Sequence, residues 1–104
     1  MSGPELTVGK SVIAEMVKLA AIEVPGVVRV GRRGPVWRSL TAGPAVTASL
    51  SEAGVRVQVW VVARPGHALL PLTRHVRSVV AATVERLLGL RLESVTITVD
   101  GVGS

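Results

Sequence analysis

The sequence contains no cysteine, no phenylalanine and no tyrosine, and it has only two tryptophans among its 104 residues. Without thiols, disulfides, thiolate nucleophiles and sulfur-ligated metal sites are excluded. The hydrophobic residues, 48% of the total, are chiefly valine, leucine and alanine. This apolar content suffices for one folded domain, so we expect a single domain over residues 1–104 with an aliphatic core and flexible ends at residues 1–5 and 103–104.

Long apolar stretches are missing as well. No run approaches the roughly 20 residues that span a bilayer. Residues 1–10 also lack the basic segment followed by an apolar segment that a secretion signal contains. These two features predict a cytoplasmic protein.

Acidic residues are scarce relative to basic ones. Seven Asp and Glu stand against twelve Lys and Arg, ten of them Arg, and the formal net charge is +5. No acid occurs between Glu23 and Glu52, a stretch that contains four arginines. This imbalance favours an anionic partner, namely nucleic acid, an anionic membrane surface or an acidic protein. The alternative interpretation is that the arginines serve solubility and have no specific ligand.

Hydrophobic periodicity predicts two amphipathic helices. Residues 10–23 carry apolar side chains at spacings of three and four, and Pro25 with Gly26 end this helix. In the second helix, Pro71 fits the first turn and Gly89 stands where a left-handed cap belongs. The apolar stripe predicted for this helix comprises Leu72, Val76, Val79, Val80, Val84 and Leu87.

Alternating apolar and polar residues predict the strands. A short strand is expected at residues 27–30, two strands joined by a hairpin loop at residues 51–54 fill 45–63, and a last strand contains Val95, Ile97 and Val99. Residues 6–8 are a candidate initial strand. We therefore predict an α+β two-layer sandwich, with two amphipathic helices packed on one face of a small mixed β-sheet.

The residues that usually carry chemistry do not form a recognisable site. His67 and His75 have no diagnostic spacing to each other or to further ligands, and we interpret His75 as a solvated side chain. No nucleophile elbow is present, and the acids are scattered. We predict no catalytic, cofactor or metal site, and no enzyme activity. A small hydrolase that uses either histidine is a weaker third hypothesis.

Residues 34–43 suggest a binding surface instead. Pro35 could start a helical turn that brings apolar side chains together within a ring of arginines, and Trp60 lies on the polar face of its strand. The candidate partner surface comprises Arg29, Arg32, Arg33, Val36, Trp37, Arg38, Leu40 and Trp60. The alternative is that Trp37 folds back over the edge of the core. Residues 31–34 also match a Gly-x-x-Gly nucleic-acid loop, although they follow a predicted strand and do not join two helices.

Two blocks of the sequence match the pattern of a known family. The N-terminal block consists of Gly9-Lys10, Ile13-Ala14, Val17, Leu19-Ala20-Ala21 and Glu23-Val24-Pro25-Gly26-Val27. The C-terminal block consists of the strand around Val59 to Val62, Gly66, Pro71, Val76, Gly89-Leu90 and Glu93-Ser94-Val95-Thr96-Ile97-Thr98-Val99-Asp100-Gly101-Val102. In this order they span nearly all of the chain from Leu6 to Val102. The chain resembles the alkaline-shock-protein family of bacterial envelope stress response proteins.

The resemblance implies a compact α/β domain of the bacterial cytoplasm without catalytic activity or cofactor. Members are associated with cell-envelope stress and homeostasis, form homo-oligomers, and can be held at the inner face of the membrane by a small membrane-anchored partner. Docking to such a partner or to an anionic membrane is thus the function that the resemblance implies, and a basic nucleic-acid-binding module is the alternative. The chain departs from the family pattern at residues 63–66, which are more basic and stiffer than the usual link, at Leu72, where an acid is common, and in its middle segment, which is rich in Arg.

Overall fold

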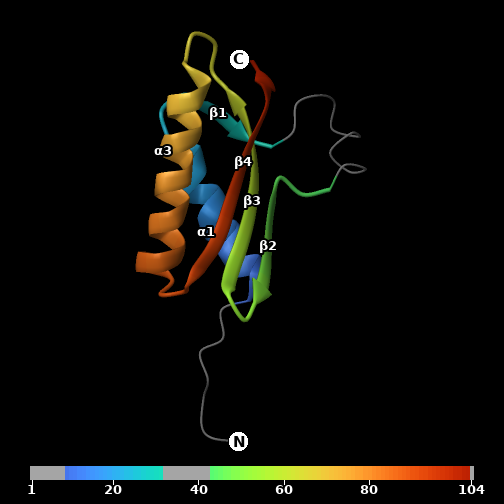
Figure 1. Cartoon of the computed structure of the whole chain (residues 1–104). Helices are drawn as coiled ribbons and strands as arrows, with labels where there is room; N and C mark the ends of the chain where they lie inside the picture. Colours follow the sequence, from blue (N-terminus) through green and yellow to red (C-terminus); the bar gives the residue numbers. More distant parts are fainter. Residues whose placement is uncertain (1–8, 32–42, 104) are drawn as a thin grey trace, which may run out of the picture.

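The computed structural model describes residues 9–31 and 43–103, and Figure 1 shows the order of its elements. They are α1 (Lys10–Ile22), β1 (Val27–Val30), β2 (Val46–Ser51), β3 (Gly54–Ala63), α3 (Leu69–Ala82), the π-helical turn η1 (Thr83–Leu87) and β4 (Leu92–Val102). The elements follow the predicted order, and the hairpin between β2 and β3 is confirmed by the pairing of Ser51 with Gly54. The candidate strand at residues 6–8 lies outside the described residues.

The strand β3 is the centre of a mixed sheet. β4 pairs with it in parallel along one side. On its other side, β2 and β1 both pair with it antiparallel, β2 with its first half and β1 with its end. Val59 is thus opposite Val46 of β2, while Val61 is opposite Val30 of β1. The two short strands lie end to end along one edge of the sheet, and β4 forms the whole of the other edge.

Both helices cover the same face of this sheet (Figure 1). The side chains of β3 at positions 55, 57, 59 and 61 point to that face and are at most 2% exposed. Against them pack Ile13, Val17 and Ala21 of α1 and Leu72, Val76 and Val80 of α3. The predicted α+β fold with two helices on one face of a mixed sheet and an aliphatic core is confirmed.

The end of the second helix differs from the prediction. After Ala82 the helix continues as the wider turn η1, in which the N–H of Leu88 donates to the carbonyl of Thr83 five residues earlier, at 3.0 Å. The wider turn rotates the next side chains, so Leu87 is 64% exposed and Leu88 packs against the core. Placing Leu87 in the buried stripe was therefore wrong, whereas the left-handed cap at Gly89 is confirmed by its φ of 68°.

Candidate docking groove and partner surface

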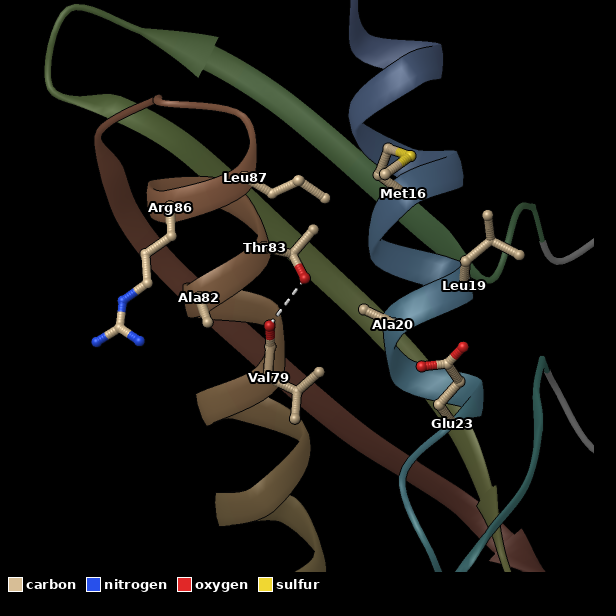
Figure 2. A pocket seen from close by; sticks show the side chains of 9 residues that line it. All are labelled: Met16, Leu19, Ala20, Glu23, Val79, Ala82, Thr83, Arg86 and Leu87. Carbon is tan, nitrogen blue, oxygen red and sulfur yellow. Dashed lines mark hydrogen bonds between the residues drawn. The ribbon is translucent and has the colours of Figure 1, made fainter.

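A groove with a volume of about 640 Å³ runs between α1 and the segment formed by α3 and η1 (Figure 2). It lies on the side of the molecule that carries the helices. The groove is lined by Met16, Leu19, Ala20 and Glu23 from α1, and by Val79, Ala82, Thr83, Arg86 and Leu87 from the second segment.

The groove lies between a second row of side chains on each helix, beside the buried row. On α1, positions 16, 19, 20 and 23 recur at spacings of three and four, and therefore lie on one face. Positions 79, 82, 83 and 86 repeat this spacing on the other side. Ala20 and Ala82 have short side chains, which leave space where longer ones would fill the gap between the helices.

The surface of the groove is mainly apolar. Figure 2 shows Leu87 extending from η1 toward Met16 of α1, with Thr83 and Ala20 between the two helices. The hydroxyl of Thr83 donates to the carbonyl of Val79 at 2.9 Å, so it is already engaged within the helix. Leu19 and Leu87 are 50% and 64% exposed at the two sides. A groove of this kind accommodates apolar side chains of a partner.

Two charged side chains, Glu23 and Arg86, line the groove and extend in different directions (Figure 2). Glu23 lines the groove at the end of α1, with its side chain directed along α1, whereas the guanidinium of Arg86 is turned away from α1 (Figure 2). Sequence reasoning missed this site, although one signal was present. The apolar stripe of α1 contained more positions than a single buried row needs, and the structure divides it into buried Ile13 and Val17 and an exposed row that includes Leu19.

Of the predicted partner surface, the structure describes Arg29 and Trp60. Arg29 is exposed on β1, and Trp60 is half-buried on β3; their register places both on the face turned away from the helices. The N–H of Gly31 donates to the carbonyl of Trp60, and the N–H of Trp60 donates to the carbonyl of Ala45, each at 2.8 Å. The backbone of Trp60 therefore holds both ends of the connection between β1 and β2.

The remaining residues of that predicted surface lie outside the described part of the chain. These residues are Arg32, Arg33, Val36, Trp37, Arg38 and Leu40. That they form a partner surface together with Arg29 and Trp60 stays a prediction.

The face of the sheet turned away from the helices carries an ion pair. Arg56 donates from Nε and Nη2 to the carboxylate of Glu93 at 2.9 and 3.0 Å, and the hydroxyl of Ser51 donates to the same carboxylate at 2.9 Å. These hydrogen bonds, that of Arg56 first, hold the pKa of Glu93 below its ordinary value. Arg56 is thus occupied by a neighbouring acid, and nothing in the described residues favours the nucleic-acid alternative.

The two histidines line one hollow at the surface. His67 and His75 both line a shallow hollow of about 260 Å³ beside Pro25 and Pro71, and both are exposed. Within residues 9–31 and 43–103, no group of three His, Asp or Glu side chains could hold a metal ion. In the same ranges, no helix has the length and apolarity needed to cross a membrane.

Comparison with protein families identifies the chain at the level of its family. A model of the alkaline shock protein 23 family, described as having a cell envelope-related function, matches residues 2–104. The chain belongs to this family. The resemblance noted in the two sequence blocks is confirmed. The chain thus belongs to a family with a cell envelope-related function.

Solved structures similar to this family member share its fold. Three of them are variants of a domain titled MamM CTD, two of these titled as a zinc form and a nickel form. Each is 15% identical to the chain and covers 88% of it, with TM-scores of 0.63, 0.62 and 0.63; the chain covers 95%, 84% and 96% of these domains. No curated protein sequence matches the chain significantly. At this identity the likeness concerns the fold alone.

Proposed function

We propose that this member of the alkaline shock protein 23 family is a non-enzymatic scaffold of the cell envelope, which associates with further copies of itself and docks on a membrane-anchored partner. The observation that carries the proposal is the apolar groove between α1 and α3 in a chain whose family has a cell envelope-related function. The groove is the docking site, and its occupant is an amphipathic segment of the partner.

The shape and polarity of the groove support an amphipathic occupant. Its volume of about 640 Å³ is within the range of ligand sites and accepts several large apolar side chains. Leu19 and Leu87 at its sides would become buried against such a segment, which removes exposed apolar area from water. An amphipathic helix that inserts one apolar row between two helices is a common mode of peptide recognition.

The charge at the groove supports a partner anchored in a membrane. Cytoplasmic segments next to a membrane-spanning helix are enriched in Lys and Arg. Glu23, which lines the groove at the end of α1, is placed to accept a hydrogen bond from such a residue (Figure 2). The lining itself supports a non-enzymatic role, because the hydroxyl of Thr83 already donates to the carbonyl of Val79.

Sedimentation with cell membranes tests the docking site. Leu19→Glu and Leu87→Glu place a charge in the groove and should each lower the recovery of the chain with membranes by about ten-fold. Leu70→Glu is the matched control, because Leu70 is 61% exposed on α3 but does not line the groove. Equal recovery of the groove and control variants would remove the groove from the proposal.

Treating the membranes identifies the kind of partner. Digestion of the exposed membrane proteins with protease should abolish recovery of the wild-type chain, since the proposal names a protein partner. Undiminished recovery with digested membranes, or equal recovery with vesicles of anionic lipid alone, would contradict it.

Two further variants test the partner surface predicted from the sequence at residues 29–40. We expect Trp37→Ala and Arg33→Glu each to lower the recovery of the chain with membranes.

Light scattering after size-exclusion chromatography tests self-association. The wild-type chain should have a mass above that of one chain, 10.8 kDa, and the mass should rise with the amount loaded. A mass of one chain at every loading would refute this half of the proposal.

A further inference from the structure

In the described part of the chain, the strand β4 forms an open edge of the sheet. It pairs with β3 and with no other strand that the structure describes, and it runs for 11 residues along the full length of β3 (Figure 1). The opposite edge consists of two shorter strands, β1, which ends at Val30, and β2, which begins at Val46. An open edge presents alternate N–H and C=O groups that can pair with a further strand.

The middle of β4 lacks the features by which natural proteins usually block an open edge. Residues 95–99 contain no charged residue, no proline and no glycine, and every one of them is β-branched. The irregularities in the pairing of β4 with β3 lie near its two ends, before Ser94 and after Val99. The central part is therefore a regular, uncharged edge with strong β propensity, which favours association with another strand.

The side chains on the inner face of β4 are incompletely buried. Val95, Ile97 and Val99 pair in register with Val57, Val59 and Val61 of β3. The three valines of β3 are at most 2% exposed, whereas their three neighbours on β4 pack against the core and stay partly exposed. α3 contacts β4, and the three side chains still remain partly exposed. A further strand beside β4 would complete the burial of the row.

We propose that β4 pairs antiparallel with β4 of a second copy of this chain, around a two-fold axis at Ile97, so that two sheets become one. This inference rests on the self-association named in the proposed function, and it specifies the surface. An axis perpendicular to the sheet keeps the helices of both copies on the same side and brings the two partly exposed rows together. Such a pairing uses the same edge on both copies and closes as a dimer.

The residues that meet in this pairing are compatible. Ile97 lies opposite its own copy, Val95 opposite Val99, and Thr96 opposite Thr98. Pairs of β-branched side chains and Thr–Thr pairs stabilise neighbouring antiparallel strands. The two acids of β4 do not meet each other, since Glu93 falls opposite Gly101 and Asp100 opposite Ser94. Glu93 is moreover held by Arg56 of its own chain.

Charge substitution at the Thr96–Thr98 pair tests the dimer. The register with Gln58 and Trp60 of β3 places both threonines on the face away from the core, so the variants should fold. In Thr96→Lys/Thr98→Lys, each new lysine meets a lysine of the other copy, and the dissociation constant of the dimer should rise at least about ten-fold. Thr96→Glu/Thr98→Glu should behave alike. An equimolar mixture of the two variants should recover the wild-type mass, because opposite charges then meet.

The control variant is Thr47→Lys/Ser49→Lys, which places the same charges on the same face of the sheet at the opposite edge, on β2. Its mass should equal that of the wild type. The proposed edge is wrong if both β4 variants keep the wild-type association, if the mixture of two folded variants stays monomeric, or if the β2 variant alone dissociates. In each of these cases self-association itself still stands. A wild-type chain that is monomeric at all loadings refutes self-association and the β4 dimer together.

Discussion

Burial distinguishes residues of the same type on the same helix. Val17 of α1 is fully buried, whereas Val12, one and a half turns away, is 49% exposed. Val17→Ala should lower the free energy of unfolding by about 2–3 kcal/mol, because it removes two methyl groups from a packed core and leaves a cavity. Val12→Ala makes the same chemical change at the surface and should cost less than about 0.5 kcal/mol. Urea unfolding measures both, and similar losses would contradict the assigned core.

Glu93 makes stability depend on pH. Its pKa is lowered by the hydrogen bonds from Arg56 and then from Ser51, so the folded state favours the ionised carboxylate. The stabilisation is present above the ordinary glutamate pKa of about 4.3 and is lost as the pH falls through the lower pKa of the folded chain. Wild type should be more stable than Glu93→Gln at neutral pH, and this difference should shrink below about pH 4.

Urea unfolding at a series of pH values measures this effect. Glu52→Gln, which removes an exposed carboxylate from the hairpin loop, is the control for the loss of one negative charge. A Glu93→Gln difference that is the same at acidic and neutral pH would show that the ion pair is not its source.

At the scale of elements, the boundary between α3 and β4 shows where sequence patterns stop being informative. The periodicity that placed Leu72, Val76, Val80 and Val84 in the core assumes a constant helical turn. The π-helical turn η1 adds one residue to a turn, which changes the face of every side chain that follows. After this turn Leu88 and Leu90 pack against the core, and this packing exists only in the folded chain.

Substitutions at the two adjacent leucines test this element. Leu88→Ala should lower the free energy of unfolding by about 1–2 kcal/mol, since Leu88 packs against the core. Leu87→Ala should lower it by less than about 0.5 kcal/mol, because Leu87 is 64% exposed. Chemical unfolding of the two variants measures the difference. A continuous α-helix, as the sequence pattern predicted, would reverse the order.

For the whole molecule, association through β4 should make thermal stability depend on concentration. The dimer adds strand pairing that the unfolded chain lacks, so the melting temperature of the wild type should rise by a few degrees over about a hundred-fold increase in chain concentration. Thr96→Lys/Thr98→Lys should have a melting temperature that is independent of concentration. Differential scanning calorimetry at several concentrations measures this, and parallel behaviour of the two proteins would argue against the β4 dimer.

The sequence by itself determined the order of the main helices and strands, the aliphatic core and the family. These depend on local periodicity, on turn residues such as Pro25 and Gly89, and on an ordered set of short matches. It also named Trp60 as part of a partner surface, and that stays a prediction.

Only the tertiary structure decided which apolar residues remain at the surface. Leu19 and Met16 fit the core as well as Val17 does when one helix is considered alone; the position of α3 leaves a groove beside them. In the same way, Val95, Ile97 and Val99 alternate like any half-buried strand, and their partial exposure follows from the place of β4 at the edge of the sheet. Periodicity specifies the face of a side chain, whereas the neighbour that covers it comes from distant parts of the chain.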